Sequence, residues 1–332
     1  MNINCYGAQV KFESRFQYCK EGRVSLLKKF SPATQGAILL VSGISIFGFS
    51  DNLTLLVSDQ VSVGQFHFSR SLIAMFMVFG LGKLFGLSVI PQYWKPILIR
   101  TFFMVTSMLL YFGVMPMMPI AEAGAGLFTS PIFVLVFSAI FFKERIGRRR
   151  VIAVIIGSCG VLLVLQPGGD GFSIFQIMPI MAGACYALGS IITYRYLRDE
   201  SSLAILMSFI ISIGLCGALI TTFLTIFPVG PDLIKRAPFL FQAWQSVDTM
   251  FWFWMAVIAA GASAALSLMT RAYQLTQTSY AAIYEYAYLI SVGLFSWLFW
   301  GIVPNNLSIL GIILIIFSGI FIVLAQQQRI ED

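Results

Sequence analysis

Long runs of apolar residues, separated by short polar stretches, recur from residue 34 to residue 326. About 20 apolar residues cross a hydrocarbon core of roughly 30 Å as a helix. The runs predict ten transmembrane helices, at 34–57, 66–86, 97–117, 121–142, 149–166, 173–194, 203–227, 250–270, 279–300 and 307–326. Because the runs are continuous and do not alternate, they favour helices over the strands of a transmembrane barrel. We therefore expect an all-α polytopic membrane protein.

The cationic residues between the runs predict the orientation of the helices. With the N-terminus inside, the inner segments hold every Lys and Arg residue except Arg70, Lys235 and Arg236. The densest cluster is the short hinge at 143–150, where five of eight residues are cationic. Cytoplasmic loops of membrane proteins carry such an excess of positive charge. We expect a multi-pass protein of the cell inner membrane with both termini in the cytoplasm.

Five helices in each half of the chain would give the two halves opposite orientations in the membrane. A section that starts near Tyr111 aligns with one that starts near Arg271, and Gly160 then falls opposite Gly319. The sequence thus predicts two inverted five-helix repeats. The expected organisation is a tail at 1–33, a first repeat at 34–166, a second repeat at 173–326 and a tail at 327–332.

Composition narrows the class of protein further. Of the 332 residues, 58% are hydrophobic and 11% are charged, whereas soluble domains carry about 25% charged residues. The net charge of +7 lies in the predicted inner segments, so it indicates membrane topology and no nucleic-acid partner. A single histidine and the lack of metal-ligand spacing argue against a metal site. No catalytic or nucleotide-binding motif occurs, so we expect neither an enzyme nor a cofactor.

Ionisable side chains inside the predicted spans are the candidate functional residues, because a charge within a bilayer is costly. Glu285 lies in the ninth segment beside Tyr284, and Tyr288 follows one turn later. A carboxylate framed by aromatic rings can recognise a flat or cationic ligand. The alternative is a protonated glutamate that is hydrogen-bonded to a neighbouring helix.

Asp51, in the first segment, has two interpretations. It lines the cargo site, or it pairs with Arg70 at comparable depth and holds the first two helices together. His67 lies one turn before Arg70 and is a candidate pH-sensitive gate. The alternative for His67 is an ordinary polar residue near the membrane interface.

A proline, a loop glutamate and a helical glycine follow one another in the first half, at Pro131, Glu144 and Gly157. Together with Arg70 and Arg100 in the second and third segments, this pattern resembles the EamA-type drug/metabolite transporter superfamily. In the second half the proline and the glutamate of the pattern are missing.

Two further elements resemble the subgroup of S-adenosylmethionine uptake and riboflavin carriers. They are Ser50-Asp51-Asn52, joined by His67-Phe68-Ser69-Arg70 in the second segment, and the Tyr-x-Tyr element at 284–286. This resemblance implies a carrier that works by alternating access, with a cargo site near the membrane midplane between the halves. The expected cargo is a small organic metabolite that is S-adenosylmethionine-like, flat and aromatic, or derived from an amino acid.

The residues expected to bind cargo are Asp51, Tyr111, Phe128, Tyr186, Tyr284, Glu285 and Tyr288. Those expected to have structural or gating roles are Arg70, His67, Pro131 and Glu144. The expected partners are the small-molecule substrate and the lipid bilayer, with a proton as candidate coupling ion and the last helix as candidate homodimer seam. The alternatives are an exporter of amino acids or drugs, an integral membrane enzyme or lipid-handling protein, and a membrane scaffold that transports nothing.

Overall fold

The computed structural model describes residues 30–118, 120–127, 129–143, 147–166, 175, 177–276, 281, 284–302 and 305–331, and within these ranges every regular element is a helix. The helices are α2 (Pro32–Thr54), α3 (Val63–Phe85), α4 (Trp94–Val114), α5 (Ile120–Leu127), α6 (Ser130–Phe142), α7 (Arg148–Leu165), α8 (Ile177–Tyr196), α9 (Ser202–Ile226), α10 (Pro231–Arg236), α11 (Pro238–Phe241), α12 (Thr249–Leu275), α14 (Ala287–Trp300) and α15 (Asn306–Glu331). A short 3₁₀ helix at Met115–Met117 extends α4.

Each of the ten predicted apolar runs coincides with helical structure. Five helices are long and apolar enough to cross a membrane, namely α2, α4 with its 3₁₀ extension, α8, α9 and α12. Shorter apolar helical stretches occur in α6, α7, α14 and α15. The prediction of an all-α polytopic membrane protein is therefore confirmed.

Two predicted spans are not the continuous helices that the sequence analysis assumed. The span at 121–142 is divided into α5 and α6, which meet at a turn containing Thr129. Pro131 lies in the first turn of α6, where its missing N–H group costs no hydrogen bond. In the span at 279–300, Glu285 and Tyr286 form a turn directly before α14. Each half of the chain therefore contains a broken helix.

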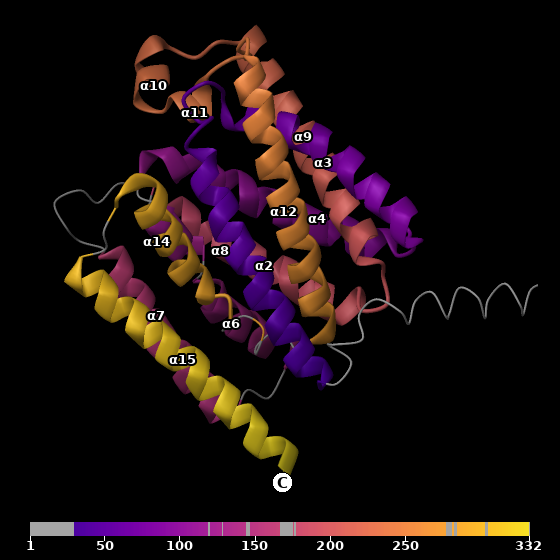
Figure 1. The fold of residues 1–332 in the computed structure, drawn as a ribbon, viewed down its shortest axis with the longest axis vertical. Helices are drawn as coiled ribbons and strands as arrows, with labels where there is room; N and C mark the ends of the chain where they lie inside the picture. Colours follow the sequence, from indigo (N-terminus) through magenta and orange to yellow (C-terminus); the bar gives the residue numbers. More distant parts are fainter. Residues whose placement is uncertain are drawn as a thin grey trace, which may run out of the picture.

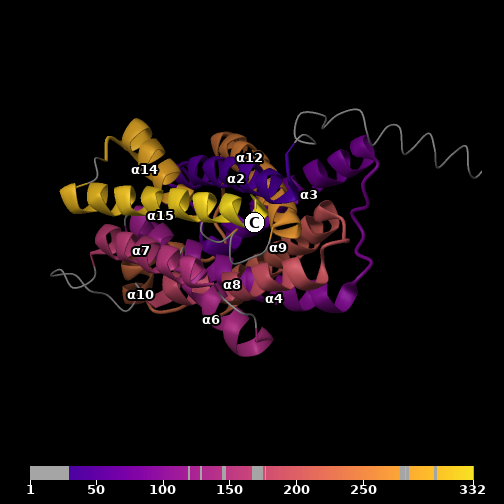
Figure 2. The same cartoon turned by 90° about the horizontal axis from the view of Figure 1, so that it is seen from below.

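The helix packing repeats when the two halves of the chain are exchanged. If α2, α3, α4, α5–α6 and α7 correspond to α8, α9, α12, α14 and α15, the most extensive helix pairs have equivalents. Thus α2 packs on α12 as α8 packs on α4, while α3 packs on its counterpart α9 and α7 on its counterpart α15. Figures 1 and 2 both show α7 lying alongside α15 at one side of the molecule. The packing of the described helices thus repeats between the two halves of the chain.

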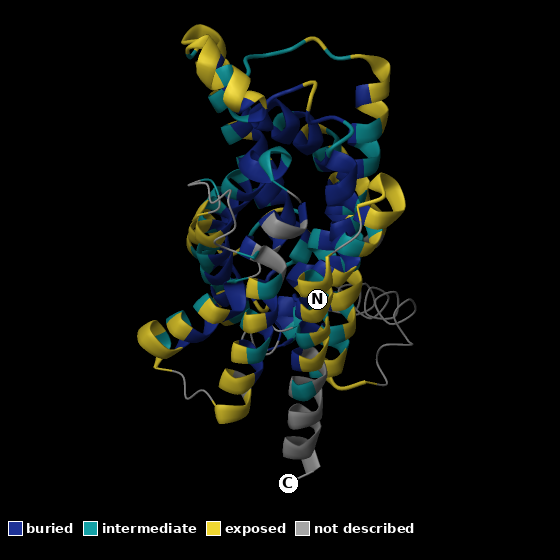
Figure 3. Ribbon diagram, turned by 90° about the vertical axis from the view of Figure 1, so that its left-hand side faces the viewer, coloured by how far each residue is buried: buried dark blue, intermediate teal, exposed yellow. Residues whose placement is uncertain are grey.

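Buried residues lie at the centre of the helix assembly, and exposed residues lie on its outer faces (Figure 3). Large apolar side chains are among the exposed ones, such as Phe76, Phe102 and Ile140. Such an apolar exterior suits contact with lipid. The interior is unusual in holding ionisable side chains, and Asp51 and Glu285 are both at most 2% exposed.

The backbones of α3 and α9 approach closely at one point because both carry a glycine there. A Cβ atom added at Gly64 would lie 2.6 Å from the carbonyl oxygen of Gly217, and one at Gly217 would overlap the carbonyl oxygen of Gly64. Small residues allow transmembrane helices to pack in this way. Gly80, on the same helix α3, has no neighbour within 4 Å of the corresponding position.

We expect Gly64→Ala to destabilise the protein by about 1–3 kcal/mol, because the added methyl group forces α3 and α9 apart. The measurement is reversible unfolding of the detergent-solubilised protein in denaturant. Gly80→Ala is the matched control and is expected to leave stability unchanged or slightly raised. Equal stability of the two variants would contradict the close packing of α3 on α9.

Candidate functional site

The two broken helices meet at a buried hydrogen bond. Ser130, at the start of α6, donates from its hydroxyl group to Oε2 of Glu285 over 3.0 Å. Glu285 lies in the turn before α14, and both side chains are fully buried. The break in the first half of the chain is thereby joined to the break in the second half.

Two tyrosines complete the surroundings of the Glu285 carboxylate. Tyr273, near the end of α12, donates to Oε1 over 2.5 Å. Tyr186 of α8 also hydrogen-bonds to this carboxylate, and its ring lies 6.4 Å from that of Tyr273, edge to face. Hydroxyl groups from three other helices thus satisfy a carboxylate that is out of contact with solvent. We call Ser130, Tyr186, Tyr273 and Glu285 the Glu285 cluster.

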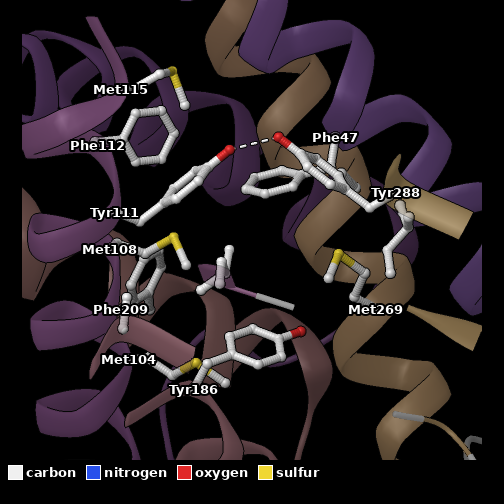
Figure 4. Close-up of a cluster of buried hydrophobic side chains, with 14 of the residues drawn as sticks. Phe47, Met104, Met108, Tyr111, Phe112, Met115, Tyr186, Phe209, Met269 and Tyr288 are labelled. Carbon is white, nitrogen blue, oxygen red and sulfur yellow. Dashed lines mark hydrogen bonds between the residues drawn. The ribbon is translucent and has the colours of Figure 1, made fainter. Parts of the chain in front are cut away.

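A second carboxylate is held in the same manner. Tyr111 of α4 and Tyr288 of α14 both donate to Oδ2 of Asp51, over 2.7 and 2.6 Å. Their two hydroxyl oxygens are 2.5 Å apart (Figure 4). These three residues, the Asp51 cluster, join α2 to the broken helix of the second half. Since Tyr288 is one helical turn from Glu285, the two clusters are neighbours.

A tight approach between helices positions the Tyr288 ring. A side chain at Gly124 of α5 would overlap the ring atoms of Tyr288, so this glycine leaves the space in which the ring lies. Gly157 of α7 does the same for the ring of Tyr286. The small residues that the sequence places in these helices therefore serve to pack the aromatic residues of the second broken helix.

Methionine side chains and one phenylalanine lie between the Tyr111–Tyr288 pair and Tyr186 (Figure 4). They surround a small central cavity of about 20 Å³, room for about one water molecule. Its walls include Arg100, Met104, Tyr186, Phe209, Met269 and Tyr273. Methionine is flexible and adapts to irregular shapes, so these walls can reshape around a larger ligand.

Arg70 and His67 form a third polar group, on α3. Nη2 of Arg70 lies 3.1 Å from Nδ1 of His67, and the guanidinium carbon lies 5.0 Å from the centre of the Phe112 ring. Asp51 takes its hydrogen bonds from Tyr111 and Tyr288, and Arg70 acts on it electrostatically. His67 is fully buried beside Phe66 and Phe112, in the second turn of α3.

Hydrogen bonds also join neighbouring segments at both ends of α12. Before α12 begins, the side chain of Gln65 donates to the carbonyl oxygen of Gln245 and accepts from its N–H group, over 2.8 and 2.9 Å. At the far end, the side chain of Gln274 donates to the carbonyl oxygens of Leu197 and Glu200, each over 2.7 Å. We call these the Gln65 closure and the Gln274 closure.

The structure brings together five of the seven residues predicted to bind cargo, namely Asp51, Tyr111, Tyr186, Glu285 and Tyr288. Tyr284 is half-buried and packs against the main core. Phe128 and Glu144 lie outside the described residues. Pro131 begins α6, next to the serine that contacts Glu285.

Sequence reasoning missed three residues of this region. Tyr273 was missed because the predicted eighth span ended at residue 270, whereas α12 continues to Leu275. Ser130 is uncharged, and only its place before Pro131 marks it in the sequence. Arg100 was counted with the inner cations and matched to an arginine of the family pattern, but its burial at 6% exposure and its place in the wall of the central cavity were not expected.

Apolar helices whose packing repeats between the two halves of the chain, with two broken helices that meet at a buried carboxylate, are typical of a polytopic helical membrane transporter. Residues 34–166 match the model of the EamA-like transporter family. The match covers the first half of the chain only, so residues 34–166 carry an EamA-like domain, and the relatives that are similar to more of the chain are named transporters.

Characterised relatives are similar to this chain at low identity. A riboflavin transporter of Vibrio cholerae is 27% identical over 206 residues, which cover 61% of this chain and 62% of that protein. The pseudopaline exporter CntI of Pseudomonas aeruginosa is 23% identical over 288 residues, or 86% of this chain and 94% of that protein. An S-adenosylmethionine uptake transporter of Rickettsia bellii is 21% identical over 284 residues, covering 84% and 88%.

A solved crystal structure supports the fold. It aligns over 86% of this chain and 96% of its own chain, with a TM-score of 0.66 at 15% sequence identity. At this level of identity the likeness concerns the arrangement of the helices alone.

We expect Tyr273→Phe to lower the free energy of unfolding by about 1–3 kcal/mol, because Oε1 of the buried Glu285 loses its donor. Unfolding in denaturant, followed by tryptophan fluorescence, measures the change. Tyr93→Phe removes a hydroxyl group from a residue that is 47% exposed and is the matched control. If both variants unfold like the wild type, Tyr273 does not stabilise the Glu285 carboxylate.

Proposed function

We propose that this protein is a secondary transporter, not an enzyme, and that it carries a small organic metabolite across the cell inner membrane by alternating access. The observation that carries the proposal is the position of Glu285 at the junction of two broken helices. Discontinuous helices near the membrane midplane, at the interface of inverted repeats, form the substrate sites of many transporters. An ionisable residue held at such a junction marks a functional site.

The chemistry of the Glu285 and Asp51 clusters supports a cargo with a cationic or flat aromatic part. Tyr186 and Tyr273 line the central cavity, and Tyr273 is hydrogen-bonded to the Glu285 carboxylate behind it. The Asp51 carboxylate, with Tyr111 and Tyr288, lies next to this cluster. Tyrosine rings attract cations through their faces, and carboxylates attract them through charge. S-adenosylmethionine, which combines a cationic centre with a flat base, is the cargo that we place first. Riboflavin is the second, since relatives are named for each.

The two closures support alternating access. With both termini in the cytoplasm, the Gln65 closure lies at the outer end of α12 and the Gln274 closure at the inner end. Each consists of two hydrogen bonds, so each end can open at a modest cost in free energy. The structure, in which both closures are formed, corresponds in this proposal to an occluded state.

Transport by the purified protein in proteoliposomes tests the proposal. We expect saturable counterflow of labelled S-adenosylmethionine by the wild type, and a loss of about tenfold or more in Glu285→Gln, because the amide keeps the shape but not the charge. Asp59→Asn removes an exposed carboxylate outside the site and is the matched control. We expect it to transport like the wild type.

Other outcomes of the counterflow experiment have separate meanings. Normal exchange by Glu285→Gln would place the cargo site away from the broken helices. An absence of exchange with S-adenosylmethionine, riboflavin and amino acids alike, by a protein that remains folded, would contradict the proposed transport.

The closures make a second prediction, which uses a single cysteine introduced in a background without native cysteines. It replaces Met108, which lines the central cavity. Gln65→Ala is expected to speed labelling of this cysteine by an impermeant thiol reagent from the outer side, by about fivefold or more. Gln274→Ala is expected to do so from the inner side. Labelling from the same side in both variants would contradict the assignment of the two closures to opposite sides of the membrane.

A further inference from the structure

Arg100 is a buried cation whose hydrogen-bonding capacity is only partly used. It lies on α4 and is 6% exposed. Its Nε donates to Oγ1 of Thr193 over a long 3.4 Å, and its guanidinium carbon lies 6.0 Å from the centre of the Phe209 ring. Among the described residues, its Nη1 has no hydrogen-bond partner. A buried cation left in this state is costly, so a partner is expected during the working cycle.

The position of Arg100 indicates where that partner binds. Arg100 lines the central cavity together with Tyr186 and Tyr273. The hydroxyl groups of these two tyrosines hydrogen-bond to Glu285. One wall of the cavity therefore carries a guanidinium group, and another carries tyrosines that are backed by a carboxylate. The remaining walls are mainly methionine, leucine and phenylalanine side chains.

Opposite charges on different walls favour a ligand that is itself dipolar. A guanidinium group binds carboxylates with charge-assisted hydrogen bonds, and its planar fork matches the two carboxylate oxygens. The Glu285 side of the cavity favours a cationic group such as an ammonium. An apolar cargo would leave Nη1 of Arg100 without a partner, and a neutral polar cargo would offer it a hydrogen bond without the attraction of opposite charge.

We propose that Arg100 binds a carboxylate group of the cargo, so that the site selects zwitterions derived from amino acids. This proposal rests on the proposed transport function and narrows its substrate class. It distinguishes S-adenosylmethionine, which has a carboxylate and an amine, from riboflavin, which has neither. The cavity must widen to admit such a molecule, and its flexible methionine walls allow this.

A matched pair of probes that differ only in the carboxylate provides the test. The probes are S-adenosylmethionine and decarboxylated S-adenosylmethionine, with L-tyrosine and tyramine as a second pair. Binding to the full-length purified protein is measured at equilibrium. For at least one pair, we expect the wild type to bind the carboxylate member about tenfold or more tightly.

The Arg100→Gln variant then separates recognition from stability. We expect it to lose the preference for the carboxylate member, with its affinity for the decarboxylated member within about twofold of wild type. Arg100→Lys keeps the charge without the planar fork and is expected to retain part of the preference. Arg198→Gln, which alters an exposed arginine at the end of α8, is the control and should retain all of it.

The results that would overturn the proposal are distinct from those that would overturn transport. Equal binding of both members of each pair by the wild type, or an unchanged preference in folded Arg100→Gln, would show that Arg100 does not bind a carboxylate. Suppose that riboflavin is transported equally well by the wild type and Arg100→Gln, and that no carboxylate probe binds. The proposal of a transporter would then stand, and the proposal that the site selects zwitterions would be refuted. A protein that transports none of these compounds would refute both proposals.

Discussion

A carboxylate inside a membrane-spanning protein needs hydrogen-bond donors from the protein itself. At Glu285 this requirement joins more helices than at Asp51. The hydrogen-bond partners of Glu285 are Ser130 of α6, Tyr186 of α8 and Tyr273 of α12. Leaving a buried charged group without its partners costs more than the roughly 1–3 kcal/mol of a neutral one. The bonds to Glu285 therefore favour one mutual arrangement of four helices, two from breaks and two from continuous spans.

The inverted repeat explains why the two breaks meet, but it does not explain what each break supplies. Exchange of the halves relates α5 and α6 to the broken helix that ends in α14, so both breaks lie close to the axis between the halves. The first break is made by Pro131 and supplies the hydroxyl group of Ser130. The second has no proline at its turn and supplies a carboxylate. The repeat thus accounts for the positions of the two breaks, and the sequence differences between the halves account for the hydroxyl group at one break and the carboxylate at the other.

The sequence predicted the helices well because long apolar runs have few alternatives in a bilayer. It also singled out Asp51 and Glu285 as candidate functional residues, since ionisable residues stand out in apolar runs, and the structure shows that both are buried. It did not predict that Tyr111 and Tyr288 would share one carboxylate oxygen, because tyrosines in a span are common and their partners are distant in sequence. The break at Glu285 was missed as well, since neither proline nor glycine marks it.

Arg100 shows a further limit of sequence reasoning. Near the end of a span, an arginine that snorkels to the interface and one that turns inward have the same sequence signature. Only the packing of α4 against α8 and α9 separates these alternatives, because it places Arg100 beside Thr193 and Phe209, away from lipid and water. Arg100 is therefore a cation of the protein interior, and it is not one of the loop cations that indicate the orientation of the helices.

The use of tyrosines as partners for both carboxylates has a consequence for the transport that we propose. A salt bridge at Asp51 or Glu285 would hold each charge strongly and would compete with a cationic cargo. A tyrosine hydroxyl group carries no charge that would cancel that of its carboxylate, so the attraction for a cation remains, most fully at Glu285 because Arg70 also acts on Asp51. When such a cargo leaves, the hydroxyl groups can satisfy the carboxylates again, and neither is left unpaired in the empty carrier. Tyrosine is therefore a suitable partner for a carboxylate that must be stable without cargo and still attract it.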